Sequence, residues 1–229
     1  MRQSAATLAL SPEDAAALAG LATASAPAGG THPTPVRLLR PAFPGTLPTG
    51  APLVGDPAVV LFGSAGWGPN REAEREFVGG TWPLLSARCP GARLHLFGGT
   101  ATGGEGIVAH PAPAESAEAF AAGAVLALPL RSGSGVRIRV LEAWARGVPV
   151  VGSAAALRGL GGSDGREWLR ADDAAGFAGA LERLAAEPAL ADCLVAAGRA
   201  RLAVDHAPAA FAAAFVALVG EVVAGRPDA

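Results

Sequence analysis

The chain of 229 residues contains no lysine, so all 18 of its basic residues are arginine. This absence excludes a Walker A lysine, a Schiff-base lysine and a phosphate clamp made from lysine. Any positive charge that meets an anion must come from an arginine or from the N-terminus of a helix. The 18 basic and 20 acidic residues nearly balance and form no basic run. This balance excludes the electrostatic footprint of a nucleic-acid-binding protein.

Cysteine is also scarce, because only Cys89 and Cys193 are present and they match no metal-ligand spacing. We expect two reduced thiols in a cytoplasmic protein. No dense cluster of Asp, Glu and His suggests a catalytic metal. The N-terminal residues lack the pattern of a signal peptide. Alanine supplies much of the apolar content, so we expect no membrane span.

The chain divides near residue 57. Residues 1–57 are predicted to form a short strand and helix followed by a Pro/Gly-rich linker. From residue 58 to 229, apolar runs alternate with helix-period segments, which predicts one α/β domain with a doubly wound, Rossmann-like parallel sheet and C-terminal helices. The expected strands are 6–10, 36–39, 58–62, 92–97, 107–110, 124–130, 148–151 and 167–170. The expected helices are 12–20, 70–88, 114–122, 136–146, 172–187, 188–202 and 209–223.

The most informative stretch is 124–153, where an apolar run, a Ser/Gly turn, a helix-period segment and a second apolar run follow one another. This order indicates a βαβ unit, which places a ligand at the carboxyl end of its first strand. The turn at 132–135 lets backbone N–H groups approach an anion beside a helix N-terminus. A second glycine-rich loop, at 63–70, either is an ordinary strand exit or lines the same crevice.

Three charged residues on the helix 136–146 each allow two interpretations. Glu142 has Arg139 three residues before it and Arg146 four residues after it, so it can form a salt bridge. Alternatively its carboxylate accepts hydrogen bonds from the two hydroxyls of a ribose. Arg137 and Arg139 lie in the first turn, where a cation opposes the helix dipole. They are either surface residues or partners of a bound anion.

Several motifs in this order resemble the C-terminal domain of family 4 glycosyltransferases, which have the GT-B fold. They are the G-x-x-x-x-x-P-N of 63–70, the P-G-A-R-L of 90–94, the L-P-L-R-S-G-S-G-V-R-I-R-V-L-E-A of 128–143, the G-V-P-V-V of 147–151 and the A-D-D of 171–173. The resemblance covers residues 58–217. Residues 6–21 and 36–42 are similar to the end of the N-terminal domain of that family and to the strand that crosses between its domains.

The resemblance implies that the chain is one GT-B half with a short N-terminal appendage, which binds a nucleoside-diphosphate sugar for a retaining hexosyltransferase without a metal or other cofactor. The donor-binding residues that it implies are Gly63, Ser64, His110, Ser134, Gly135, Val136, Arg137, Arg139 and Glu142. Glu142 would bind the ribose, and Arg137 or Arg139 would neutralise the diphosphate together with backbone N–H groups. Ser134 stands where the family has a glutamate that contacts the sugar. The base would lie near His110, which by itself would more often be an ordinary surface histidine.

The acceptor-binding N-terminal domain of that family has almost no counterpart here, and no catalytic residue is assigned. Either a partner chain or a second copy supplies this half, or the chain binds a nucleotide and catalyses little alone. A non-catalytic scaffold module is the main alternative. A nicotinamide-binding Rossmann protein is disfavoured, because Ile138 replaces the third glycine of G-x-G-x-x-G and no acidic residue ends the strand 148–151.

Overall fold

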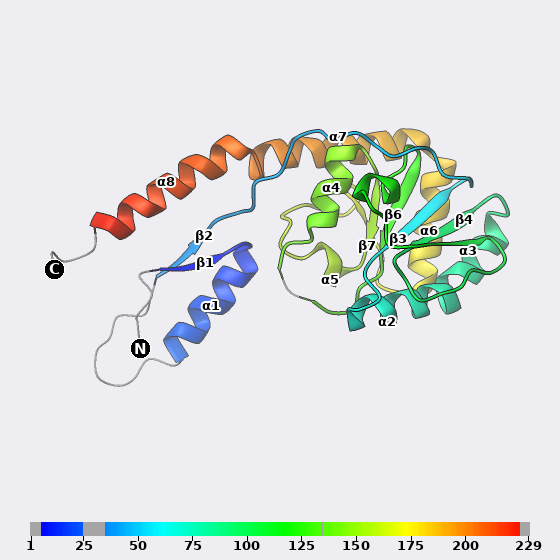
Figure 1. The fold of residues 1–229 in the computed structure, drawn as a ribbon, viewed down its shortest axis with the longest axis horizontal. Helices are drawn as coiled ribbons and strands as arrows, with labels where there is room; N and C mark the ends of the chain where they lie inside the picture. Colours follow the sequence, from blue (N-terminus) through cyan, green and yellow to red (C-terminus); the bar gives the residue numbers. More distant parts are fainter. Residues whose placement is uncertain (1–5, 25–34, 134, 225–229) are drawn as a thin grey trace.

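A six-stranded parallel sheet organises the molecule, with the strand order β5-β4-β3-β6-β7-β8 (Figure 1). The computed structural model describes residues 6–24, 35–133 and 135–224. The strands of this sheet are β3 (Ala58–Phe62), β4 (Arg93–Phe97), β5 (Ile107–His110), β6 (Ala124–Leu128), β7 (Val150–Gly152) and β8 (Leu169–Arg170). This sheet and its helices confirm the predicted doubly wound α/β fold.

Helices cover both faces of the sheet, and each face has its own apolar cluster. One cluster surrounds Trp144 and Phe120, and the other surrounds Phe77 and Leu181. All five residues of β6 are buried, as expected for a parallel strand that is covered on both sides. The helical elements of this part are α2 (Gly68–Glu76), η1 (Phe77–Thr81), α3 (Trp82–Arg88), η2 (Ser116–Ala119), α4 (Ile138–Arg146), α5 (Ala154–Leu157), α6 (Ala174–Ala186) and α7 (Pro188–Asp205).

Some predicted elements are corrected by the structure. The single helix expected over 70–88 is α2 and α3 joined by a π-helical turn, and that turn contains Gly79 and Gly80. Helix α2 begins at Gly68, two residues before the expected start, with Trp67 at its N-cap position and Pro69 in the first turn. The helix expected over 114–122 is only the 3₁₀ turn η2, and the strand expected over 124–130 ends at Leu128.

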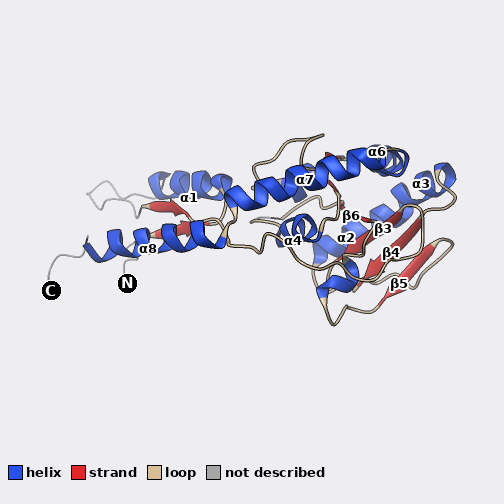
Figure 2. Ribbon diagram, turned by 90° about the horizontal axis from the view of Figure 1, so that it is seen from above, coloured by secondary structure: helices blue, strands red, loops and turns tan. Residues whose placement is uncertain are grey.

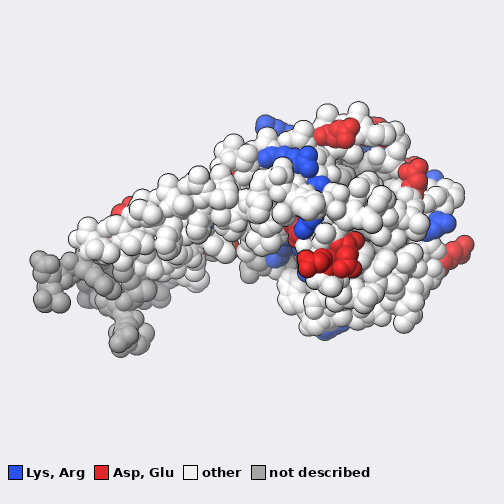
Figure 3. All heavy atoms as spheres, turned by 45° about the horizontal axis from the view of Figure 1, so that its top comes forward, with Lys and Arg blue, Asp and Glu red and all other residues white. Residues whose placement is uncertain are grey.

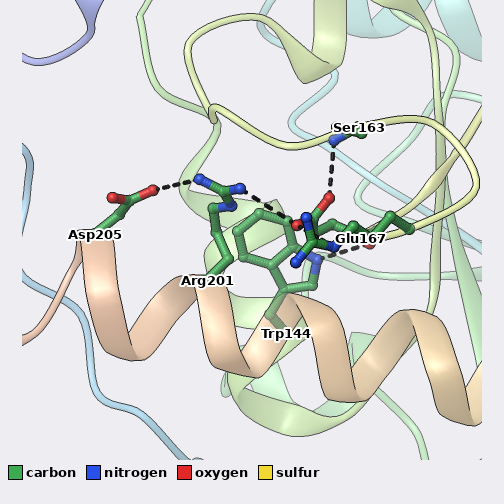
Figure 4. A network of polar contacts seen from close by, with 6 residues as sticks. Trp144, Ser163, Glu167, Arg201 and Asp205 are labelled. Carbon is green, nitrogen blue, oxygen red and sulfur yellow. Dashed lines mark hydrogen bonds and ion pairs between the residues drawn. The ribbon is translucent and has the colours of Figure 1, made fainter.

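Helix α7 is held against the sheet by a buried polar network (Figure 4). Glu167, 2% exposed, accepts hydrogen bonds from the Ser163 backbone N–H at 2.8 Å and from Arg201 at 3.4 Å. Arg201 also pairs with Asp205 at 2.9 Å, and the indole N–H of Trp144 donates to the carbonyl oxygen of Glu167 at 3.2 Å. These contacts join α4, α7 and the loop before β8.

The N-terminal elements and the C-terminal helix α8 form a second, smaller layered unit, which we call the slice. It consists of β1 (Thr7–Ala9), α1 (Pro12–Ala24), β2 (Val36–Leu38) and the C-terminal helix α8 (Pro208–Ala224). Strands β1 and β2 are parallel and lie between α1 and α8 in both views (Figures 1 and 2). Ser11 accepts a hydrogen bond from the Asp14 N–H at 3.1 Å, so its side chain caps the start of α1. Arg37 and Glu221 pair at 3.1 Å and join β2 to α8.

The linker between the slice and the main sheet is fixed to the domain along its length, and we call residues 39–57 the strap. Its backbone N–H groups donate to carbonyl oxygens of the domain, from Leu47 to Ala145 at 3.0 Å and from Gly50 to Phe120 at 3.1 Å. Phe43, Leu47 and Leu53 pack against the cluster around Trp144. The strap therefore belongs to the packed structure.

The helical run Pro188–Ala224 is long and apolar enough to cross a membrane by length and composition. The sequence analysis, which attributed much of the apolar content to alanine, did not identify this run. The most apolar window of the run is entirely unburied. One helix of this kind is weak evidence for a membrane span.

Candidate functional site

The chain order reverses between the neighbouring strands β3 and β6, because β4 and β5 continue to one side and β7 and β8 to the other. Crevices at such switch points, outside the carboxyl ends of the strands, are where ligands bind in open α/β sheets. A cavity lies at this point in the structure. Its lining includes Phe62, Gly63, Asn70, Glu74, Phe97, Leu128 and Pro129.

The loop after β3 forms the first wall of the crevice. The Gly63 N–H donates to the Phe97 carbonyl oxygen at 3.1 Å, so this predicted donor already has an acceptor within the protein. A side chain at Gly63 would collide with the amide of Asn70, which explains why glycine is needed there. The Ser64 N–H has no acceptor among the described residues, and its carbonyl oxygen accepts from Asn70 Nδ2 at 3.1 Å. Ser64 is thus an available backbone donor of this loop.

The loop after β6 forms the opposite wall. Gly133 and Gly135 adopt positive φ angles of 133° and 78°, which the Gly-rich sequence permits. Ser134 lies outside the described residues, so the structure says nothing about its predicted role. The backbone N–H groups of Gly135 and Val136 have no acceptor within the described parts of the chain. They precede α4, and the positive end of this helix dipole adds to their partial charges.

Two arginines bring positive charge to the start of α4, where they line a further cavity that shares Leu128 and Leu130 with the crevice. Arg137 is the N-cap residue of α4, whereas the sequence predicted that it lies in the first turn. Its guanidinium lies 5.9 Å from the centre of the Trp67 ring. Arg139 is half-buried, with its guanidinium 4.9 Å from the Phe62 ring. The pKa of Arg137 is lowered mainly by burial and to a smaller extent by repulsion from Arg158. The pKa of Arg139 is likewise lowered mainly by burial and to a smaller extent by repulsion from Arg137. An anion between these residues would relieve their repulsion.

Glu142 forms the salt bridge that the sequence offered as one of its two interpretations. Its Oε1 accepts hydrogen bonds from Arg146 Nε at 2.9 Å and from Ser116 Oγ at 2.5 Å. Arg146 also donates to Ser116 Oγ and to the carbonyl oxygen of Pro48 in the strap. Glu142 Oε2 has no hydrogen-bond partner among the residues that the structure describes, and the side chain is 12% exposed. The carboxylate is thus held in place by one oxygen, with the other available.

His110 lies at the carboxyl end of β5, on the edge strand of the sheet. Its ring stacks on Phe97 with the centroids 4.1 Å apart, and its Nε2 lies 2.9 Å from Nδ1 of His95. Burial and the neighbouring His95 lower the pKa of His110. It is therefore not an isolated surface histidine.

One carboxylate of the crevice was missed by the sequence analysis. Glu74, on α2, is 9% exposed and accepts hydrogen bonds from the N–H groups of Thr100 and Ala101 at 2.9 and 2.7 Å. It anchors the loop after β4. Its partners lie 26 and 27 residues away, so no local sequence pattern marks this role.

A second cavity adjoins the crevice and shares Pro129 and Leu130 with it. Its charged lining residues are Glu76, Arg131, Arg158, Asp172 and Asp173. Arg131 pairs with Glu76 at 2.5 Å, and Asp172 accepts from the Ala154 N–H at 2.7 Å. No group of three or more His, Cys, Asp or Glu side chains suited to a metal ion occurs within the described residues.

The doubly wound sheet with a crevice at its switch point defines a class of α/β domains, and comparison with known proteins narrows that class. A family model described as glycosyl transferase-like matches residues 75–217, which is more than half of the chain. The chain therefore belongs to this glycosyltransferase-like family. A search of curated protein sequences finds no match.

Solved structures of glycosyltransferases have the same fold. Sucrose-phosphate synthase from Thermosynechococcus elongatus superposes with a TM-score of 0.70 at 20% identity, over 96% of this chain and 58% of that protein. The Anabaena protein HepE in complex with UDP-glucose gives a TM-score of 0.73 at 13% identity, over 96% of this chain and 65% of HepE. The C-terminal domain of LpcC, a group 1 family glycosyl transferase from Francisella tularensis, gives 0.57 at 14% identity, over 69% of this chain and 89% of that domain. The chain thus spans less than two thirds of the first two proteins.

Proposed function

We propose that this chain is the donor-binding half of a retaining, metal-independent hexosyltransferase of the family 4 type, and that it binds a nucleoside-diphosphate sugar. The observation that carries the proposal is one juxtaposition on α4. The N–H groups of Gly135 and Val136, which have no acceptor among the residues that the structure describes, lie at the helix N-terminus with Arg139, and Glu142 lies one turn along. This arrangement offers donors for a diphosphate and a carboxylate acceptor for ribose hydroxyls.

The resident salt bridge of Glu142 is compatible with this role. Arg146 and Ser116 occupy Oε1 and fix the carboxylate, and Oε2 is left for a hydroxyl donor. The second cavity, beyond Pro129, is the place we assign to the sugar. The UDP-glucose complex of HepE supports this class of ligand for the shared fold.

We propose further that an acceptor-binding half completes the active site, either from a partner chain or from a second copy, and that transfer by this chain alone is slow. The chain covers 58% of sucrose-phosphate synthase and 65% of HepE. Transfer needs donor and acceptor held together in a closed cleft. We expect the protein to act in the cytoplasm.

The first test is thermal unfolding with UDP, GDP, ADP and NAD for the wild type and for Glu142→Ala. A ligand at about 100 times its Kd stabilises the folded state by about 2.7 kcal/mol, which is a shift of several degrees in Tm. We expect a shift with one nucleoside diphosphate that Glu142→Ala loses. Glu187→Gln is the matched control, because it removes an exposed carboxylate that pairs with Arg183 at 3.1 Å on α6. This control should keep the full shift.

Because Glu142→Ala also breaks the contact with Arg146, its loss of binding is compared with that of Arg146→Met, which leaves the carboxylate in place. Equal loss of nucleotide binding in both variants would mean that binding depends on the intact salt bridge and not on a direct contact with the Glu142 carboxylate. That outcome, or the absence of a shift with every nucleotide, favours the second candidate function, a non-catalytic scaffold module. The observation behind this candidate is that Glu142 already has protein partners.

A further inference from the structure

The carboxylate of Glu74 lies beside the crevice and is not used by the proposed function. It is buried and lines the cavity at the switch point together with Gly63. Its Oε1 accepts hydrogen bonds from the N–H groups of Thr100 and Ala101, at 2.9 and 2.7 Å, and from the Thr100 hydroxyl at 3.0 Å. These donors offset the cost of burying the carboxylate. The carboxylate and the loop after β4 therefore hold each other in place.

The loop after β4 is shaped around this carboxylate. A Cβ added at Gly99 would lie 1.9 Å from Glu74 Oε2, so the carboxylate leaves no space for a side chain at this position. Gly99 is not among the glycines with a positive φ. It is thus the contact with the carboxylate, and not the backbone conformation, that requires glycine here. The substitution Gly99→Ala therefore displaces the carboxylate without removing it.

The same loop is in direct contact with the loop after β3. The carbonyl oxygen of Gly98 accepts a hydrogen bond from the Ala65 N–H at 2.9 Å. Gly98 has a φ of 71°, and a Cβ added to it would lie 3.1 Å from the carbonyl oxygen of Gly63. The loop after β3 is therefore held partly by a loop that Glu74 fixes.

In the loop after β3, three of four successive N–H groups already have acceptors within the protein. Those of Gly63, Ala65 and Gly66 donate at 3.1, 2.9 and 3.2 Å. The Ser64 N–H, between them, has no acceptor among the residues that the structure describes. Its direction is fixed, because the planar peptide groups before and after it are both hydrogen-bonded. An N–H group held in this way is a preorganised donor for an anion.

We propose that Glu74 is a positioning residue of the diphosphate site. It holds the loop after β4, and thereby the carbonyl oxygen of Gly98 to which the Ala65 N–H is bonded. The adjacent Ser64 N–H is in this way kept directed at the phosphates, and Glu74 itself contacts no ligand. The inference rests on the proposed function and deepens it, because it assigns recognition of the phosphates, and not of the nucleoside, to this wall of the crevice.

The test compares a nucleoside diphosphate with its nucleoside by isothermal titration. The diphosphate is UDP, GDP or ADP, whichever stabilises the wild type most, and the weaker nucleoside is measured by competition with it. The ratio of the two Kd values measures what the phosphates contribute to binding. In Glu74→Ala this contribution should fall about tenfold, as expected when a hydrogen bond to a charged group is lost, while the affinity for the nucleoside stays unchanged.

Two conservative variants separate hydrogen bonding from charge. Glu74→Gln should lose less than Glu74→Ala, because its amide oxygen can accept the same hydrogen bonds. Glu72→Gln is the matched control, since it neutralises an exposed carboxylate on the same helix that has no hydrogen bond to a described residue. This control should keep the wild-type ratio of Kd values.

Gly99→Ala gives a second route to the same loss. It should reduce the contribution of the phosphates in the wild type, and it should have little further effect in Glu74→Ala, where the colliding group is gone. Hydrogen exchange of the free protein gives a readout that needs no ligand. In Glu74→Ala the N–H groups of Thr100 and Ala65 should lose protection, while Val60 in the centre of the sheet keeps it.

The outcomes distinguish this inference from the proposed function. If no nucleotide binds the wild type, the proposed function fails and this inference fails with it. This inference alone is overturned if a diphosphate binds but Glu74→Ala weakens diphosphate and nucleoside equally, or if Ala65 keeps its protection in that variant. It is also overturned if Glu72→Gln shows the same loss, or if Gly99→Ala has the same effect with and without Glu74. Should Glu74→Ala not fold, Glu74→Gln and Gly99→Ala decide by the same ratio.

Discussion

The main domain and the slice are both built from parallel strands connected by helices, but they differ in how much of that structure is covered. The main sheet has six strands, and helices pack on both of its faces. The slice has two strands, and α8 contains no buried residue. Leu21 is 66% exposed and Phe215 is 45% exposed. Local sequence is enough to form such elements, whereas their burial depends on how many strands lie side by side.

Charge is distributed in the same uneven way. On the face in Figure 3, charged side chains gather over the main domain, while the described part of the slice is mostly uncharged. A surface that is both apolar and poor in charge is typical of a region that contacts another protein or a membrane. For the stability of the isolated chain, we expect the exposed side chains of the slice to tolerate substitutions that the buried side chains of the main domain do not.

The largest effect is expected in the core of the main domain, for Trp144→Ala. Trp144 is fully buried and stacks on Trp168 with the centroids 5.8 Å apart. Its loss should lower the free energy of unfolding by about 3–5 kcal/mol, because the cavity cannot collapse fully. Urea denaturation measures this change. Trp144→Phe keeps much of the apolar volume but loses the hydrogen bond to Glu167, so it should be clearly milder. A loss below about 1 kcal/mol for Trp144→Ala would contradict the picture of a tightly packed core.

A smaller effect, on affinity and not on the core, is expected for Gly133→Ala. An added Cβ would collide with the guanidinium of Arg137, which must then move. We expect nucleotide binding to weaken about tenfold, or about 1.4 kcal/mol, by titration calorimetry. Gly165→Ala is the matched control, since its φ of 75° is also positive but open space surrounds an added Cβ. Equal affinities for the two variants would contradict a role of Arg137 in binding.

The junction between the two regions should respond to pH through His206. This side chain is 2% exposed, and its Nδ1 lies 2.8 Å from the carbonyl oxygen of Pro41 in the strap. Burial lowers its pKa below 6.5, partly offset by the hydrogen bond to Pro41 and by Asp205. The unfolded chain therefore takes up the proton first, so stability is lost as the pH falls from above 6.5 toward the folded pKa. Thermal melts across this range should show a smaller loss for His206→Asn than for the wild type. An equal loss would mean that other groups, such as His110, account for it.

The smallest effect is expected in the slice itself, for Phe215→Ala. At low protein concentration the free energy of unfolding should change by no more than about 0.5 kcal/mol, because this side chain is already exposed. The same measurement at rising concentration sharpens the comparison with the main domain. If a second copy covers α8, the Tm of the wild type rises with concentration and that of Phe215→Ala rises less. A concentration-independent Tm in both proteins would contradict self-association through α8.

The sequence was most informative where one short stretch determines one element. The apolar runs 58–62 and 107–110 coincide with β3 and β5, and the C-cap of α4 is Gly147 with a φ of 74°. The spacing of four residues predicted the pair Glu142–Arg146 as one alternative. What sequence could not supply were partners from distant segments, such as Ser116 and Pro48 around that pair. The π-helical turn was missed for another reason, because a continuous helical pattern runs through Gly79 and Gly80.

Arg146 has a consequence that extends beyond its own helix. Its guanidinium contacts Glu142 on α4, Ser116 in η2 and the carbonyl oxygen of Pro48 in the strap. A ligand that draws on the Glu142 carboxylate therefore acts on the segment that leads to the slice. By linkage, a molecule that docks on the slice and tightens the strap should change the affinity for that ligand. The ligand should change the affinity for that molecule by the same factor. Binding at either end of the molecule would then change the affinity at the other end through Arg146.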